Sequence, residues 1–196
     1  MKTFRIILCA VVSVALFLSI ALSCFASTMQ KTGGSYSTTT TITEESRRWI
    51  LDHFDHCRSI DELLAEIDRF GCENFVYQRY QMPLIQAFCL DKFLFEDNLH
   101  GVCFEFSCFV KCVVLVWKES HQRNDVQAFV YDVILPNGGR HSYNFIMAEN
   151  RTWYFCLTTD VSRVASGRKA PGPEEITGMT PQAYMKKYGD TLTNIH

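Results

Sequence analysis

The stretch His100–Cys112, HGVCFEFSCFVKC, decides how this chain folds. It opens an apolar segment, 103–117, whose length and all-round hydrophobicity favour a buried helix over a strand. Cys103 follows a glycine and begins this helix, where unpaired N–H groups and the helix dipole favour a thiolate. Cys108 and Cys112 lie one turn apart on a shared face and are expected in the core. Their parallel side chains disfavour a disulfide between them.

The N-terminus predicts export, to the periplasm, the cell surface or the medium. Lys2 and Arg5 precede a run of 17 mostly apolar residues, Ile6–Leu22, and small residues follow as far as Ala26. This is the layout of a signal peptide cleaved after that alanine. A lipid on Cys24 and an uncleaved anchor stay open as alternatives, since the run reaches the lower limit for spanning a bilayer. Contact with a membrane is expected only through this segment, if it is uncleaved or lipidated.

The chain therefore divides into a signal peptide (1–26), a flexible Ser/Thr/Gly-rich linker (27–43) and one domain (44–196). The 196 − 26 = 170 residues after the signal peptide are enough for a single core. The net charge of −2 gives no indication of a nucleic-acid partner.

Helical spacing and caps predict helices before the central one, at 46–57, 59–71 and 84–95. Ser59 and Glu62 form a capping box, and Gly71 is expected to end the second of these helices. A short strand is expected at 75–77, and a short helix after Thr180.

After the central helix, three strand-like runs follow, at 126–135, 140–148 and 152–159. Short turns join them, at Pro136–Gly139 and Asn150–Arg151, so they predict an antiparallel meander. Helices followed by a sheet define an α+β domain.

His141 is the residue best placed to assist a thiol. It starts the second strand directly after a tight turn, where its side chain can face the end of the central helix. Cys103 would attack as a thiolate, His141 would transfer the proton, and a third group would hold the ring.

Two short motifs resemble the transglutaminase-like cysteine enzymes. Gly101–Ser107, GVCFEFS, looks like the G-x-C-x-[DE]-[YF]-[AS] segment that opens their central helix, and His141–Asn144, HSYN, is similar to their H-a-W-N. Trp153-Tyr154 matches the aromatic pair of the following strand, and the interval 141 − 103 = 38 suits the family. The resemblance covers Gly101 to Thr159. It implies a papain-like α+β core in which N-terminal helices and the cysteine-bearing helix pack on an antiparallel sheet.

The third member of the catalytic set is where the chain departs from this family. Leu157 occupies the position of the aspartate that orients the histidine. The nearest carboxylate is Asp160, which is carried as a candidate, although strand alternation would turn it to the opposite side. Its other reading is an ordinary aspartate at a strand end. The family's G-i-P-A-R stretch is also absent.

The resemblance implies an exported cysteine protease or amidase that acts on peptide or carboxamide bonds through an acyl-thioester on Cys103. Hydrolysis is favoured over cross-linking, the substrate is a protein or peptide (cell-wall peptide included), and no cofactor is expected. The alternative is a catalytically impaired domain that serves as a binding module. A third reading is a structural domain stapled by disulfides.

The remaining cysteines and histidines leave further alternatives. Seven cysteines follow the leader, and they permit three disulfides and one free thiol or seven free thiols. His53, His56 and Cys57 have the spacing of zinc ligands, but no second ligand pair accompanies them, so no metal is expected. Gln86 and the Cys103 backbone N–H are the candidate donors to an oxyanion.

Overall fold

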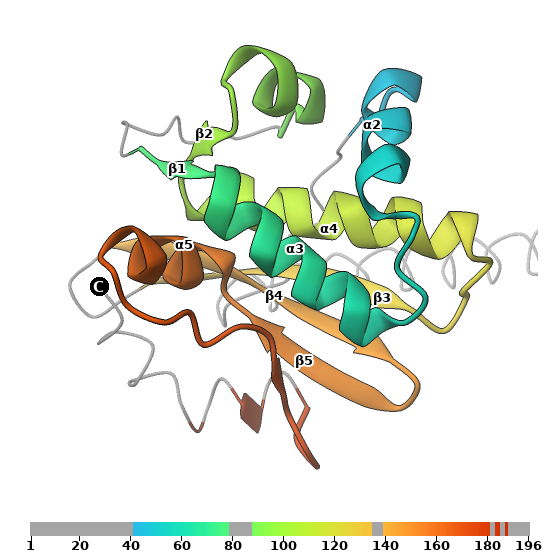
Figure 1. Ribbon diagram of the computed structural model, residues 1–196. Coiled ribbons are helices and arrows are strands. Elements are labelled where there is room, and N and C mark those ends of the chain that lie inside the picture. The colour runs from blue at the N-terminus through green and yellow to red at the C-terminus, as the bar shows by residue number, and fades with distance from the viewer. Residues whose placement is uncertain (1–40, 79–87, 135–138, 181–182, 185–186, 188–196) are drawn as a thin grey trace, which may run out of the picture. The chain divides into compact units, whose positions relative to one another are not determined.

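The computed structural model describes residues 41–78, 88–134, 139–180, 183–184 and 187. In these residues, helices lie over one face of an antiparallel four-stranded sheet (Figure 1). The expected signal peptide and most of the linker lie outside them. No helix in the described part of the chain is long and apolar enough to cross a membrane. The fold class is α+β, as predicted.

The first two helices of the described residues are α2 (Glu44–Phe54) and α3 (Ile60–Asn74). Thr43 caps α2, and Ile42 packs against the core, so the end of the expected linker belongs to the folded part. Ser59 caps α3 by accepting the Glu62 N–H at 3.2 Å, as predicted. The Glu62 carboxylate does not return to Ser59: it accepts the N–H of Arg58, one residue earlier.

The prediction that Gly71 ends α3 is wrong, because the helix continues to Asn74. Gly71 is buried within it, and a Cβ there would lie 2.7 Å from Leu157 Cδ1. Glycine therefore allows a close contact between two segments rather than a helix end.

The short strand is confirmed as β1 (Val76–Tyr77), which pairs in parallel with β2 (His100–Gly101). Between them, a π-helical turn, η1 (Lys92–Glu96), replaces the end of the helix expected at 84–95. Residues 84–87 of that prediction lie outside the described residues.

The central helix is confirmed as α4 (Cys103–Ser120). It is buried along most of its length, and Cys108 and Cys112 are fully buried, as expected. Near its C-terminal end, Trp117 Nε1 donates to the Cys57 carbonyl at 3.1 Å, which ties α4 to the connection between α2 and α3.

The meander is confirmed as β3 (Gln127–Ile134), β4 (Arg140–Ala148) and β5 (Arg151–Phe155), and the two-residue strand β6 (Glu174–Glu175) extends it. Ala148 pairs with Arg151 across a two-residue turn, Glu149–Asn150, so the turn predicted at Asn150–Arg151 lies one residue earlier and Arg151 belongs to the strand. Both turn residues have positive φ, 54° and 59°, which gives the hairpin its tight connection.

The third strand ends earlier than predicted. β5 stops at Phe155, and a helix, α5 (Leu157–Ala165), follows where a strand was expected to run to Thr159. Leu157 and Val161, four residues apart, are buried in the same core as α3, so helical spacing explains the segment better than strand alternation. The helix expected after Thr180 lies largely outside the described residues.

Both faces of β4 are covered. Ile146 and Ala148 belong to the core shared with the helices. Tyr143 and Phe145 belong to a second cluster, which includes Ile176 of the C-terminal segment. The sheet is therefore the middle layer of the described domain.

Candidate functional site

Cys103 is the first residue of α4, and 7% of its surface is exposed. The chain arrives in an extended conformation, with φ −115° and ψ −175° at Val102. The Glu105 carboxylate turns back and accepts the Val102 N–H at 3.0 Å. A carboxylate therefore shares this positive helix end with the thiol.

Gly101 makes the approach to Cys103 sterically possible. A Cβ at this position would lie 3.0 Å from Glu105 Cβ and 3.2 Å from Phe93 Cε2. Both distances are tighter than ordinary carbon contacts, so a larger residue would push β2 away from η1 and α4. This is the physical reason for glycine two residues before the cysteine.

His141 is the second residue of β4 and is 4% exposed. Three residues later, Asn144 Nδ2 donates to the Ser107 carbonyl of α4 at 2.9 Å. Since Ser107 lies four residues after Cys103, this bond aligns the beginnings of α4 and β4 at the same end of the sheet (Figure 1). Strand alternation places the His141 side chain on the face of Tyr143, opposite the face that Asn144 presents to α4, so the prediction that His141 faces the end of the central helix is wrong.

His141 and Cys103 are not joined by a hydrogen bond among the residues that the structure describes. Instead, His141 Nε2 lies 3.2 Å from the Sγ of Cys156, which is 5% exposed. Cys156 Sγ also lies 3.0 Å from Thr159 Oγ1. Burial raises the pKa of the Cys156 thiol, which keeps it neutral. No motif in the sequence marks Cys156 as a functional residue.

Asp160 lies on α5, not at a strand end, and is 1% exposed. Its Oδ1 accepts the Gly172 N–H at 3.3 Å, and it interacts with the carboxyl group of Asp68 on α3. Burial, and then the proximity of Asp68, raise the pKa of Asp160 to about 8. No hydrogen bond or ion pair of the described residues connects it to His141, so the structure places the candidate third residue elsewhere.

Leu157, at the position of the family aspartate, lies in the helical core. It is 2% exposed and packs against Gly71 of α3. Its side chain therefore serves the contact between α3 and α5.

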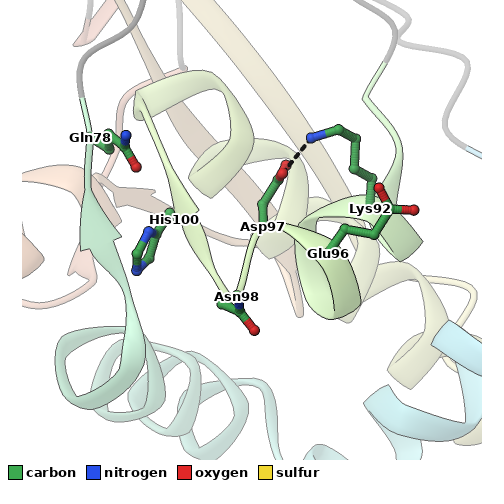
Figure 2. Close-up of a pocket in the computed structure, with 6 residues that line it drawn as sticks. All are labelled: Gln78, Lys92, Glu96, Asp97, Asn98 and His100. Carbon is green, nitrogen blue, oxygen red and sulfur yellow. Dashed lines mark hydrogen bonds and ion pairs between the residues drawn. The ribbon is translucent and has the colours of Figure 1, made fainter.

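A polar pocket lies beside the segment that leads to Cys103. It has a volume of about 480 Å³ and is lined by Gln78, Lys92, Glu96, Asp97, Asn98 and His100. Figure 2 shows Gln78, directly after β1, beside His100 of β2, and Lys92 paired with Asp97. His100 stands three residues before Cys103. The pocket can accept a polar group of a ligand close to the start of α4.

The zinc alternative gains no support from the geometry. His53 stacks on Trp49, with ring centroids 3.9 Å apart, and its Nδ1 lies 2.7 Å from the Trp49 carbonyl oxygen. Within the described ranges, no group of three or more His, Cys, Asp or Glu side chains is arranged to hold a metal ion. Gln86, the other candidate oxyanion donor, lies outside these ranges.

Comparison of the chain with protein-family models, with curated proteins and with solved structures gave no match.

Proposed function

We propose that the protein is an exported, transglutaminase-like cysteine enzyme of papain-like architecture that acts on peptide or carboxamide bonds. Cys103 forms the acyl-thioester, and His141 transfers the proton. Hydrolysis is the favoured outcome, and the substrate is a protein or peptide. The proposal of export rests on residues 1–26.

The observation that carries the proposal is the alignment of α4 with β4. The Asn144–Ser107 hydrogen bond brings the start of the helix that Cys103 opens to the end of the sheet at which His141 stands. The polar pocket lies against the same end through His100. The His141 side chain lies on the sheet face turned away from α4, so a His141–Cys103 contact requires the start of β4 or of α4 to move when substrate binds.

The reaction has two steps. The Cys103 thiolate attacks the carbonyl carbon, the bond from carbon to nitrogen breaks, and the His141 imidazolium gives its proton to the departing amine or ammonia. Water then attacks the thioester while His141 takes a proton from the water. The carboxylic acid leaves, and the Cys103 thiolate and the His141 imidazolium are restored. The Cys103 backbone N–H, at the helix start, is available to the oxyanion.

The test is to label the non-reduced protein with iodoacetamide from about pH 5 to about pH 9 and to map the modified cysteines by mass spectrometry. Cys89 is exposed and serves as the internal standard for an ordinary thiol. We expect Cys103 to react faster than Cys89 at the acidic end, and His141→Ala to remove that advantage. Cys103→Ala should abolish acyl transfer at a cost of about 1 kcal/mol or less in stability, whereas the buried-cysteine variant Cys112→Ala should keep activity.

A binding module is the second candidate, favoured by the missing aspartate at Leu157 and by the separation of Cys103 from His141 in the described structure. It predicts that Cys103 labels no faster than Cys89. It also predicts that Cys103→Ala binds peptide as well as the unaltered protein, while His100→Ala in the pocket weakens binding.

A further inference from the structure

His141 and Cys156 form a buried pair that the sequence did not reveal. His141 Nε2 and Cys156 Sγ are 3.2 Å apart, which is short for a contact between nitrogen and sulfur. Less than a tenth of either residue is exposed, so solvent does not compete for the bond. On its other side the sulfur contacts Thr159 Oγ1 at 3.0 Å.

The register of the β4–β5 hairpin explains why Cys156, and not Leu157, contacts His141. The last pair of the ladder is Asn144 with Phe155, and one step further would bring Tyr143 opposite Cys156. Residues opposite each other share a face, and residues two apart on one strand do too. Cys156 therefore falls on the face of His141, whereas residue 157 falls on the other face and enters the helical core.

We propose that Cys156 is the positioning residue that holds the His141 ring, in the role that the resemblance gives to an aspartate. The inference rests on the proposed function, because it concerns the proton transfer that His141 carries out there. Cys156 touches neither substrate nor the reacting carbonyl.

The neutral state of the thiol sets the direction of the hydrogen bonds. Burial raises the pKa of Cys156, so its S–H remains and can donate to Thr159 Oγ1. The sulfur lone pair then accepts the Nε2–H of His141. In this tautomer Nε2 carries the proton and Nδ1 is the basic nitrogen of the ring. The ring tautomer is therefore the property that Cys156 controls.

The test compares Cys156→Ala, Cys156→Ser and a distant control, Cys57→Ala, in two measurements on the purified full chain. The first is the rate of Cys103 alkylation across pH, with Cys89 as the standard. The second is the ¹⁵N spectrum of the His141 ring in a Cys103→Ala background, which reports the tautomer without any reaction. If Cys156→Ala does not fold, Cys156→Val fills the site and also lacks the acceptor.

We expect Cys156→Ala to lower the alkylation rate of Cys103 near neutral pH by about fivefold, the effect of one hydrogen bond of about 1 kcal/mol. The Nε2–H tautomer should lose its preference in the same variant. Cys156→Ser retains an acceptor and should stay within about twofold of the unaltered protein, as should Cys57→Ala. Loss in the alanine variant with rescue by serine would support a positioning role, because a purely structural role would not move the tautomer.

Three results would overturn the inference. One is an unchanged rate and tautomer in Cys156→Ala. The second is faster alkylation of Cys103 in Cys156→Ala, which would mean that the contact with Cys156 keeps His141 from assisting Cys103. The third is alkylation of Cys156 itself, which would make it the nucleophile. Failure of the proposed function looks different: Cys103 of the unaltered protein would then react no faster than Cys89.

Discussion

At the scale of single residues, the Asp68–Asp160 pair is the most unusual electrostatic feature of the domain. Both carboxyl groups have raised pKa values, for which burial is the first cause, and Asp160 is nearly inaccessible. Asp160 Oδ2 has no hydrogen-bond partner in the described structure. Two such groups side by side cannot both ionise without a large cost in free energy.

This pair predicts a stability that depends on pH. The pKa of folded Asp160, about 8, lies above the ordinary 3.8, so the folded protein binds a proton more tightly than the unfolded chain does. The free energy of unfolding should therefore fall as pH rises from about 4 to about 8. Asp160→Asn keeps an acceptor for Gly172 and gains a donor to Asp68, so it should flatten this slope and stabilise the protein at pH 8 by about 1–3 kcal/mol.

Urea unfolding at several pH values measures this effect. The control is Asp52→Asn, since Asp52 is exposed on α2 and its loss should leave the slope intact. Equal slopes in the unaltered protein and in Asp160→Asn would show that the buried pair does not share a proton.

At the scale of elements, α5 is the helix that sequence patterns failed to predict. Residues 152–159, TWYFCLTT, are rich in aromatic and β-branched residues, as expected of a strand, and nothing local marks the change of structure at Cys156. The signal is tertiary: Leu157 fills the space that Gly71 leaves open on α3, and α5 packs on α3. The prediction that Gly71 ends α3 failed because a sequence does not distinguish a glycine at a helix cap from a glycine at a close contact between helices.

The contact between α3 and α5 makes a prediction about Gly71→Ala. The new methyl group would lie 2.7 Å from Leu157 Cδ1, so overpacking should outweigh the helix-propensity gain of about 1 kcal/mol. We expect a net loss of about 1–2 kcal/mol. Leu157→Ala alone should cost about 2–5 kcal/mol by leaving a cavity.

The decisive measurement is the stability of the double variant Gly71→Ala/Leu157→Ala, because the new methyl group at position 71 would enter the cavity left by the Leu157 side chain. Its loss of stability should be smaller than the sum of the single losses. Additive values in thermal or urea unfolding would mean that the two residues do not compete for the same space.

At the scale of the whole molecule, the parts predicted well are those with local signals. The apolar length of 103–117, the cap at Ser59 and the strand-like runs of the meander correspond to α4, α3 and β3–β5 in the structure. The positions of Cys103 and His141 on these elements followed from the same signals. The contacts of His141 and Asp160 could not be predicted from these local signals, because they depend on the register of the hairpin and on the packing of α5 against α3. Register is nevertheless readable from a tight turn, so pairing Ala148 with Arg151 would have pointed to Cys156.

The cysteines give the last prediction, which concerns the covalent state of the domain. The seven cysteines of the described residues form no disulfide in the structure: Cys57, Cys72, Cys89, Cys103, Cys108, Cys112 and Cys156. Of the two arrangements that their number allowed, the structure has the one without bridges. Alkylation after unfolding without reductant should therefore modify all seven, and reductant should leave the melting temperature unchanged.

Three disulfides would give a different result in both measurements. Only one of these thiols would be alkylated, and reduction would lower stability, since each bridge typically contributes about 2–4 kcal/mol. Such a result would favour the stapled structural domain over the enzyme if Cys103 were among the bridged residues, because a thiol in a disulfide cannot attack a carbonyl. Without disulfides, the stability of the domain comes from the hydrophobic clusters on the two faces of β4. The Cys103 thiol can then attack a carbonyl.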